Sequence, residues 1–352
     1  MQYHIERTKA WLDAKTEEEK LGIAPIYVEI SPVGHCNHRC TFCAVDYIGY
    51  KSNTLPVETL KRCISDMAIQ GVRSIMFAGE GEPLLHPKLA EIINYTKEVG
   101  IDVGITTNGT MLTQKFIQEC LPAISWIKVS LNAGDRDTYA KIHQTKVEDF
   151  DKVWRNLAAA CIHKDLVGAS TVIGIQMVLL PENIDTVEDA VIDAKHCGLN
   201  YVVVKPYSQH LKSLTRLYEG IKYGSAISMA AELSQHNSKD FEVVTRYIAM
   251  QAHDSEDRGY SKCYSTPYFW AYIMATGDVY GCSAYLLDER FKYGNILEQS
   301  FSEVWRGDRR RVAIGFVENQ LDISECRKNC RMDKVNKYLW DIKNPNEHAN
   351  FI

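Results

Sequence analysis

Three cysteines near the N-terminus constrain this 352-residue chain more than any other feature. Cys36, Cys40 and Cys43 follow the spacing C-x3-C-x2-C within one short loop. Three thiolates on one loop can hold three irons of a cubane iron–sulfur cluster and leave the fourth iron without a protein ligand. The alternative is a zinc site, because zinc takes four ligands and His35 or His38 can complete the set. The spacing favours the open-cornered cluster.

The residues around this loop add to the motif. An apolar strand at residues 26–30 leads into the loop, and the aromatic Phe42 stands directly before Cys43. This arrangement resembles the radical S-adenosylmethionine (SAM) family. The resemblance implies that the open iron binds the amino and carboxylate groups of SAM. It also implies that one electron from the cluster cleaves SAM to a 5′-deoxyadenosyl radical, which abstracts a hydrogen atom from the substrate.

The composition indicates a globular protein without a nucleic-acid partner. The chain is 45% hydrophobic and 24% charged, and its net charge of −5 leaves no basic surplus. The basic run at residues 309–311 is typical of a solvated helix face. The N-terminus lacks a signal-peptide pattern, and no apolar run reaches about 18 residues. We therefore expect a cytoplasmic protein with no membrane contact.

Cysteine usage favours metal ligation over disulfides. The chain has 11 cysteines but no export signal, and disulfides are rare in the cytoplasm. Seven of them lie in motif-like settings. The other four lie within helical patterns, where we expect them to be buried as small apolar side chains. These four are Cys63, Cys120, Cys161 and Cys197.

The first two thirds of the chain alternate between apolar strand patterns and helical patterns. The predicted strands are residues 26–30, 72–79, 102–106, 126–131, 170–178 and 201–204. The predicted helices between them are residues 56–71, 86–99, 113–120, 135–164 and 182–197. Such alternation predicts right-handed crossovers and a parallel sheet. Six units do not close an eight-stranded barrel, so we predict an open, partial (β/α)6 barrel, which is also the fold that the resemblance implies.

Ligands of parallel sheets collect at the carboxyl ends of the strands. The second strand ends in a Gly-Glu-Gly-Glu-Pro stretch, where Gly79 and Gly81 would let the backbone approach a ligand closely. An ordinary turn between strand and helix is the alternative. The resemblance implies that Gly81, Glu82 and Pro83 bind the methionyl amino group of SAM. Whether Glu80 shares this role stays open.

Polar residues follow three further strands and are further candidates for SAM binding. Asn108 lies in an Asn-Gly turn after the third strand. Ser130 and Asn132 are two residues apart on the fourth strand and so share one face. The resemblance implies that residues of this kind contact the ribose and the methionyl group. Gln176, on the fifth strand, either faces the adenosine or is a satisfied core amide.

The end of the sixth strand is the best candidate for substrate contact. Lys205, Tyr207, Gln209 and His210 cluster just after the apolar run, although a solvated loop can have the same composition. If the pocket shifts the pKa of Lys205, Tyr207 or His210, that side chain can act as a general base. We therefore predict these three as catalytic candidates.

The last third of the chain carries a second cysteine set. Cys263 and Cys282 flank a predicted hairpin at residues 266–282, and Cys326 and Cys330 follow. Four cysteines can supply complete thiolate ligation of a second cluster, with zinc as the alternative. This layout resembles the SPASM or twitch extension of radical SAM enzymes. The full SPASM pattern has seven cysteines and two clusters, so four cysteines imply one auxiliary [4Fe–4S] cluster here.

These motifs divide the chain into four expected parts, in which the barrel core is followed by a small α+β cluster-binding extension. The parts are an N-terminal helical lead-in (residues 1–24), the radical SAM partial barrel (25–210), a helical connector (211–258) and the auxiliary cluster domain (259–352).

A cluster capped by four cysteines cannot bind the substrate directly, so we expect it to accept an electron during an overall oxidation. We expect the substrate to be a polar small molecule of the sugar, nucleotide-sugar or aminocyclitol type. Only 24 residues precede the barrel core at residue 25 and 22 follow Cys330, so we expect no peptide-binding domain in this chain, although a separate protein could supply that function. Redox-neutral epimerisation or dehydration, modification of a ribosomal peptide and a non-catalytic iron–sulfur or zinc module stay open. The implied partner is an electron donor such as flavodoxin or ferredoxin.

Overall fold

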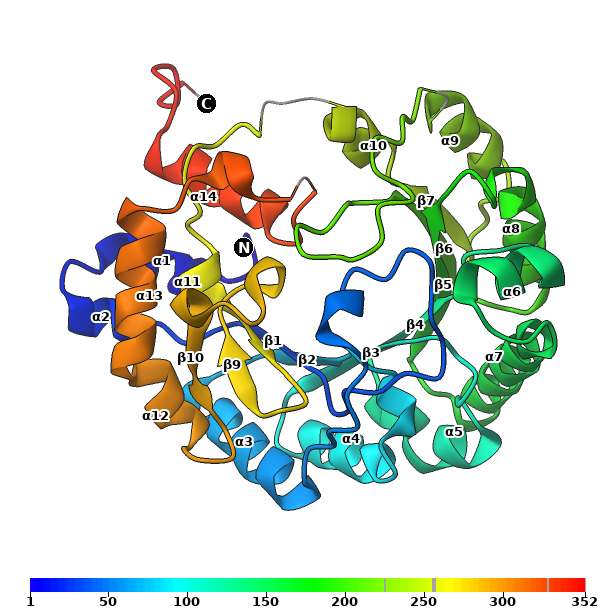
Figure 1. Ribbon diagram of the computed structural model, residues 1–352, viewed down its shortest axis with the longest axis horizontal. Helices are drawn as coiled ribbons and strands as arrows, with labels where there is room; N and C mark the ends of the chain where they lie inside the picture. The colour runs from blue at the N-terminus through cyan, green and yellow to red at the C-terminus, as the bar shows by residue number, and fades with distance from the viewer. Residues whose placement is uncertain (225, 255–257, 328, 352) are drawn as a thin grey trace.

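The computed structural model describes residues 1–224, 226–254, 258–327 and 329–351, and it contains one mixed sheet surrounded by helices (Figure 1). The strands are β1 (Tyr27–Ile30), β2 (Ser74–Phe77), β3 (Asp102–Thr107), β4 (Trp126–Ser130), β5 (Val172–Leu179), β6 (Tyr201–Pro206), β7 (Glu242–Thr245), β8 (Trp270–Ile273), β9 (Asp278–Tyr280) and β10 (Lys292–Asn295).

The longer helices surround the strands in Figure 1. The helices are α1 (Ile5–Asp13), α2 (Glu17–Leu21), α3 (Val57–Gln70), α4 (Leu89–Glu98), α5 (Gln114–Cys120), α6 (Arg136–His143), α7 (Glu148–Val167), α8 (Val187–His196), α9 (Ala226–Ser234), α10 (Tyr247–Asp254), α11 (Thr266–Phe269), α12 (Phe301–Arg306), α13 (Asp308–Asn319) and α14 (Asp333–Lys343). In the described ranges, none of these helices is long and apolar enough to cross a membrane.

The sheet is an open barrel of parallel strands with a short antiparallel extension. Its strand order is β10-β9-β8-β1-β2-β3-β4-β5-β6-β7. All neighbours from β8 through β1 to β7 are parallel, whereas β8, β9 and β10 pair antiparallel. The strands curve around a common interior with the helices outside, and β7 and β10 do not pair (Figure 1). The predicted partial parallel barrel is therefore confirmed, and β7 and β8 extend it at its two edges.

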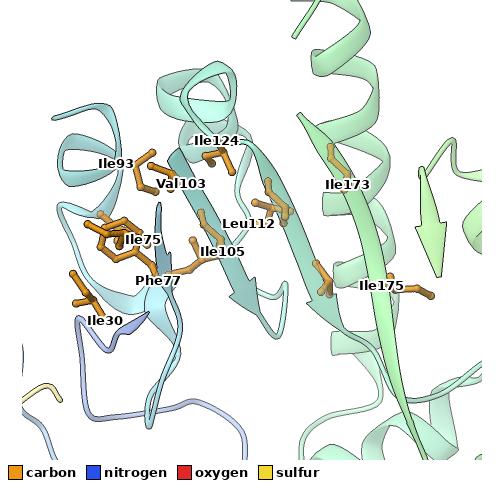
Figure 2. Packing of buried hydrophobic residues seen from close by; sticks show 14 of the residues in the cluster. Ile30, Ile75, Phe77, Ile93, Val103, Ile105, Leu112, Ile124, Ile173 and Ile175 are labelled. Carbon is orange, nitrogen blue, oxygen red and sulfur yellow. The ribbon is translucent and has the colours of Figure 1, made fainter. Parts of the chain in front are cut away.

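The alternation of apolar residues along each strand shows which side chains face the outer helices and which face the barrel interior. Val103, Ile105, Ile173 and Ile175 are fully buried and face the outer helices (Figure 2). The residues between them face the barrel interior, since successive side chains of a strand point to opposite faces. On β4, for example, Ile127 and Val129 join the same buried core, and Lys128 points inward. Polar residues at alternate positions are therefore directed to the interior.

The predicted strands and helices are found close to their expected bounds, but two segments differ. Residues 211–258 were expected to be a helical connector, yet the structure places β7 between α9 and α10. The short apolar run around Val243 adds to the sheet by pairing in parallel with β6. The predicted hairpin at residues 266–282 is formed by β8 and β9, but its first four residues form helix α11.

Arg310 on α13 forms hydrogen bonds that join the C-terminal part of the chain to the N-terminal segment before β1. Arg309 and Arg311 are exposed as predicted, whereas Arg310 is fully buried, contrary to the solvated face expected for residues 309–311. The Arg310 guanidinium donates hydrogen bonds to the carbonyls of Pro267 (3.0 Å) and Leu21 (3.0 Å), among others. A buried charge persists only when its donors are satisfied in this way. A helical periodicity alone could not show that one arginine of three points inward.

The four cysteines outside the motifs pack as expected. Cys63, Cys120 and Cys161 are buried, and Cys197 is half-buried beside the Cys161 thiol. All cysteines in the described part of the chain are free thiols, which is consistent with metal ligation rather than disulfides.

Candidate active site

The three-cysteine loop lies directly after β1, at the carboxyl ends of the strands. Cys36, Cys40 and Cys43 are each half-buried, and burial raises the pKa of all three thiols. The thiols of Cys36 and Cys43 raise the pKa of Cys40 further, so the three sulfurs lie close together. Thiols in this state need a cation before they can become thiolates together. The donor set therefore fits a cluster held by three cysteines.

The loop is held in place by the end of α6. The backbone N–H groups of Arg39 and Thr41 donate to the carbonyls of His143 (3.1 Å) and Ile142 (2.9 Å). The Sγ of Cys40 lies 3.2 Å from Nδ1 of His143, which is fully buried. Burial lowers the pKa of His143 to about 3, so the ring is neutral. A neutral imidazole at this position can support one cysteine without adding charge to the site.

His38 also contacts this region, and this bears on the zinc alternative. One ligand atom from each of His38, Cys40 and His143 lies within 4.8 Å of the others. Across the described residues, this group includes neither Cys36 nor Cys43. His38 and His143 therefore lie behind Cys40 and do not complete a four-ligand site with the three cysteines.

Glu82 is held at the edge of the site by backbone and side-chain donors. Its carboxylate accepts hydrogen bonds from the Thr107 hydroxyl (2.6 Å) and from the backbone N–H groups of Asn108 (2.7 Å) and Leu84 (3.0 Å). Glu82 is 3% exposed, and burial raises its pKa to about 7 despite these donors. Its charge also raises the pKa of the Cys36 thiol, so the predicted Gly-Glu-Pro stretch lies beside the cysteine loop.

The two glycines of this stretch serve the packing of two loops. A Cβ atom on Gly81 would lie 2.3 Å from the carbonyl oxygen of Val33 and 2.5 Å from that of His35. A Cβ atom on Gly79, which has φ +118°, would lie 2.3 Å from the Cβ of Ser31. We expected these glycines to admit a ligand. In the structure, Gly81 admits the backbone of the cysteine loop and Gly79 admits Ser31, which leads into that loop.

Glu80 points away from Glu82 and towards the C-terminal extension. Its carboxylate accepts hydrogen bonds from the Tyr272 hydroxyl (3.0 Å) and from the Ala275 backbone N–H (2.8 Å). Both oxygens are therefore used to join the barrel to the β8–β9 hairpin. The contacts do not support the role in SAM binding that was left open for Glu80.

The polar residues predicted to contact SAM occupy different surroundings. Asn108 is buried and bonds to the side chain of Asn37 in the cysteine loop (2.8 Å). Ser130 is half-buried and pairs in register with Gln176, with both side chains on the interior face. Phe42 packs against the ring of His143, with ring centres 5.9 Å apart. These four residues lie at or near the carboxyl ends of the strands, and their contact with SAM stays a prediction.

Asn132 does not face the interior as predicted. Its side chain is fully buried, its Oδ1 accepts from the Val178 backbone N–H (2.7 Å), and its Nδ2 lies 3.3 Å from the His143 ring. Asn132 also has a positive φ of 56°, a conformation in which asparagine is enriched among non-glycine residues. The chain turns at this residue, so the shared face expected for Ser130 and Asn132 is lost. Asn132 supports β5 and His143.

The three catalytic candidates differ in what their polar atoms can do. His210 is buried, with Nδ1 accepting from the Lys212 backbone N–H (3.1 Å) and Nε2 donating to the Ser283 carbonyl (3.2 Å). Burial lowers its pKa to about 4. Tyr207 donates to Gln209 (3.1 Å), and burial raises its pKa. Neither group is suited to accept a proton, which corrects the prediction that His210 or Tyr207 can serve as the base.

Lys205 has the properties of a base. It points from β6 into the interior, and desolvation together with the nearby Lys128 lowers its pKa well below the usual value. Among the described residues, its amine has no hydrogen-bond or ion-pair partner. A desolvated amine of this kind is uncharged more often than a surface lysine and can accept a proton.

The second cysteine set forms one enclosed centre. Cys263, Cys282, Cys326 and Cys330 line the same cavity, and Arg327 lines it as well. Burial raises the pKa of the Cys282 thiol well above its usual value, and the other three cysteines raise it further. Four converging thiols in a desolvated cavity match the donor set of a fully cysteine-ligated metal cluster.

Hydrogen bonds to sulfur surround this cavity. The Thr266 hydroxyl lies 3.2 Å from Sγ of Cys263, and the Asn336 amide donates to the same sulfur (3.5 Å). The Tyr285 hydroxyl lies 3.4 Å from Sγ of Cys326. Donors of this kind orient metal ligands and tune the potential of a cluster. The structure therefore supplies both the ligands and their supporting groups.

Sequence reasoning missed several charged residues of the interior. Lys128, Arg327 and Arg331 lie close enough to Lys205 to lower its pKa, as does Arg246. The sequence pattern could have identified Lys128, because it is a single charged residue between apolar neighbours on a predicted strand. Arg327 and Arg331 each directly follow a ligand cysteine, and only the fold shows that they reach the barrel.

Two family models match this architecture. The model of the radical SAM superfamily matches residues 30–194, and that of the SPASM iron–sulfur cluster-binding domain matches residues 263–331. The chain belongs to the radical SAM superfamily. The two matched domains imply SAM and two [4Fe–4S] clusters as the cofactors of this radical SAM protein, and each cysteine set has the ligand number that its cluster requires.

Curated relatives resemble only part of this radical SAM chain. A GTP 3′,8-cyclase of Chlorobaculum tepidum is 34% identical over 141 residues, which is 40% of this chain and 42% of that protein. An S-adenosylmethionine-dependent nucleotide dehydratase of Lacinutrix mariniflava is 35% identical over 112 residues, which is 30% of this chain and 23% of that protein. The chain thus spans less than half the length of these relatives.

Solved structures support the fold over most of the chain. Streptococcus suis SuiB bound to the precursor peptide SuiA has a TM-score of 0.66 at 18% identity, covering 84% of this chain and 68% of SuiB. Native anSMEcpe with bound AdoMet has a TM-score of 0.60 at 17% identity, covering 93% of this chain and all of that chain. At these identities the likeness shows a shared fold.

Proposed function

We propose that this radical SAM protein removes a hydrogen atom from a polar small molecule and oxidises it, with the auxiliary cluster as electron acceptor. The observation that carries the proposal is the four-cysteine cavity. Four thiols converge there, and Arg327, which lines the cavity, is close enough to lower the pKa of Lys205 in the barrel interior. A cluster with four cysteine ligands has no position for substrate, so electron transfer is the role that its ligand set supports.

Each cofactor has its own residues in this proposal. Cys36, Cys40 and Cys43 hold the cluster that binds SAM, and Glu82 lies beside them. When bound, SAM at this cluster supplies a 5′-deoxyadenosyl radical, and the auxiliary cluster supplies a one-electron acceptor. His143 and the buried backbone contacts of the loop fix the thiols in place.

Lys205 has a defined part in an oxidation. A secondary alcohol that becomes a carbonyl loses one hydrogen atom from carbon, one proton from oxygen and one electron. Lys205 is the interior base that can take this proton, because desolvation and nearby cations lower its pKa. The surrounding cations favour the uncharged amine before the reaction and also favour release of the proton afterwards. Lys205 is therefore the proposed general base.

The substrate class is the finer part of the proposal. The partly matching relatives include proteins whose names refer to GTP and to nucleotides, and these are small polar molecules. A redox-neutral dehydration is the second candidate, because one such relative is named as a dehydratase. A flavodoxin or ferredoxin is the proposed electron donor, because the first cluster must be reduced before SAM is cleaved.

The test begins with metal content and SAM cleavage. Anaerobically reconstituted protein should contain about eight irons, and a Cys36/Cys40/Cys43→Ala variant about four. Wild-type protein with a chemical reductant should form 5′-deoxyadenosine from SAM, and the triple variant should not. Zinc at the four-cysteine site, with about four irons in wild-type protein, would overturn the electron-acceptor role.

The base is tested separately with Lys205→Met. Once a substrate is found, this variant should still cleave SAM but lose oxidised product, and the loss should shrink as the pH of the assay rises. The matched control is Lys97→Met, because Lys97 is an exposed lysine on α4. Equal product from Lys205→Met and Lys97→Met would rule out the proposed base.

A further inference from the structure

A group of cations lies on the interior face of the barrel, where most barrels carry apolar side chains. The group comprises residues from two strands, from the segment after β7 and from the loop that carries the last two ligand cysteines. Its members are Lys128, Lys205, Arg246, Arg327 and Arg331, and we refer to them as the interior cation cluster.

Strand register explains how residues far apart in sequence meet here. Lys128 on β4 and Lys205 on β6 both occupy inward positions, with the inward residues of β5 between them. Arg246 directly follows β7, and its backbone N–H donates to the carbonyl of Val204, next to Lys205. These three positions therefore lie on the same face of the sheet, with Lys128 level with Gly174 of β5 and Lys205 level with Val178, four residues closer to the carboxyl end of β5.

The C-terminal loop adds two arginines from the opposite edge. Arg331 forms an ion pair with Glu29 on β1, and its Nη1 donates to the Tyr27 hydroxyl (2.8 Å). Arg327 lines the auxiliary cavity, and its Nε is buried without a hydrogen-bond partner among the described residues. An orphaned buried donor on a cation points to a ligand that the protein is built to receive.

The charge of this group is far from balanced by the protein. Lys128 feels repulsion from Arg331 and Arg246, and Glu29 is the carboxylate that acts on it among the described residues. Lys205 feels repulsion from all four other members. Like charges held together in a desolvated place destabilise a fold, so such a group indicates a functional site.

Solvent reaches the cluster, so a ligand can also reach it. The Arg331 side chain is 42% exposed although it lies against β1. Lys128 and Lys205 are half-buried, and Arg246 is exposed. A purely structural charge network would be enclosed and paired throughout, whereas only Arg331 of this group has a carboxylate partner among the described residues.

We propose that the interior cation cluster binds a phosphate group of the substrate. This inference rests on the proposed function, since it names the part of the small molecule that anchors it in the barrel. Arg327, with its Nε unpartnered in the described part of the chain, would hold the phosphate together with Lys128, Arg246 and Arg331. The reacting carbon would then lie between this anchor and the SAM site, within reach of Lys205.

Charge favours phosphate over a single carboxylate. With Lys205 uncharged, as the proposed function requires, four cations still face one carboxylate, so a ligand with about two negative charges matches better than one with a single charge. Arginine guanidinium groups bind phosphate oxygens in pairs, and lysine adds a point charge. The SAM carboxylate is a weaker candidate, because Lys128 lies two positions further into the barrel than Ser130 at the end of β4.

The test uses inorganic pyrophosphate as the probe on anaerobically reconstituted protein. Binding is measured by calorimetry for wild-type protein, for Lys128→Met and for the control Lys115→Met, because Lys115 is a lysine on α5 with an 83% exposed side chain. Malonate serves as the carboxylate probe. We expect Lys128→Met to weaken pyrophosphate binding at least tenfold, about 1.4 kcal/mol, and Lys115→Met to leave it unchanged.

Three results would overturn the inference. Pyrophosphate can bind Lys128→Met as tightly as wild type, malonate can bind as tightly as pyrophosphate, or Lys128→Met can lose SAM binding instead. If Lys128→Met does not fold, Arg246→Met carries the same test from an exposed position.

Formation of 5′-deoxyadenosine separates this inference from the proposed function. Pyrophosphate binding without SAM cleavage in wild-type protein would sink the proposed function and leave the anion site. SAM cleavage without pyrophosphate binding would overturn the anion site and leave the proposed function standing.

Discussion

The two cysteine sites of this chain differ in how the sequence builds them. The first lies within one loop, so its three thiols are brought together by local geometry and by the support of His143 behind Cys40. The second combines cysteines from before β8, from after β9 and from the segment before α14. It exists only when the whole extension is folded. A local site can tolerate loss of distant contacts, whereas an assembled site cannot.

Supporting groups contact the sulfurs at both sites. Around the first site, His143 lies against Sγ of Cys40 and Tyr50 bonds to Cys43, and further hydrogen bonds hold the backbone of the loop. Around the second, hydroxyl and amide groups contact the sulfurs, as Thr266 and Asn336 do at Cys263. The two sites therefore differ in the number and origin of their cysteines more than in how the sulfurs are supported.

The largest effect should come from removing one ligand at each site. Cys40→Ala should abolish SAM cleavage, because the SAM-binding cluster loses a ligand. Cys282→Ala should keep SAM cleavage but lose oxidised product, because the electron has no acceptor. The measurement is 5′-deoxyadenosine and product formation by chromatography. Normal product formation by Cys282→Ala would show that the second cluster is not an acceptor.

The two glutamates of one loop offer the next contrast. Glu82→Gln replaces an acceptor of three hydrogen bonds beside the first site, so SAM binding should weaken at least tenfold. Glu80→Gln should leave SAM binding unchanged and lower the free energy of unfolding by about 1.5–3 kcal/mol, because it weakens the link to the hairpin. Equilibrium binding and urea unfolding measure the two effects. If Glu80→Gln and Glu82→Gln changed SAM binding and unfolding to the same extent, the two glutamates would not have the separate roles described here.

A smaller effect concerns the pH dependence of stability. Desolvation, followed by repulsion from nearby arginines, lowers the pKa of Lys128 to about 8, and an unfolded lysine titrates near about 10.4. Between these values the unfolded chain binds more protons, so stability should rise with pH across this window. Lys128→Met should reduce that rise, leaving the part due to Lys205, and should be more stable than wild type near neutral pH. The urea midpoints of both proteins across the window provide the test.

The smallest effect should be on cluster potentials. Tyr285→Phe removes a hydroxyl group near Cys326, and Tyr50→Phe removes the one that bonds to Cys43. Loss of a donor to sulfur disfavours the reduced cluster, so each potential should fall, on the order of 20–50 mV. Anaerobic spectroscopic titration would assign each shift to its own cluster. A shift in both clusters from one variant would mean that the sites are coupled.

Much of this molecule could be predicted from sequence because its signals are local. The C-x3-C-x2-C spacing, the alternation of strands and helices and the Gly-Glu-Gly-Glu-Pro stretch each lie within a short window. The parallel barrel, its open form and the C-terminal cluster domain were confirmed on this basis. Element type also held for nearly every predicted strand and helix.

What could not be predicted depends on direction and distance. The sequence shows that Glu80 and Glu82 are neighbours but not that one turns to the hairpin and the other to β3. It shows polar Asn132 after a strand but not the positive φ that turns its side chain away. The interior cation cluster is made by strand register over more than two hundred residues, so no window of sequence contains it.

The pairing of β1 with β8 fixes an order of assembly. Residues Tyr27–Ile30 leave the ribosome first, and their partner Trp270–Ile273 follows only when most of the chain has been made. At ordinary elongation rates this interval is roughly 10 to 50 s. During this interval the edge of β1 has no partner, and the inward-pointing charge of Glu29 disfavours pairing of that edge with other chains. The loop that holds the first metal centre therefore emerges, and can be loaded, well before the second centre can form.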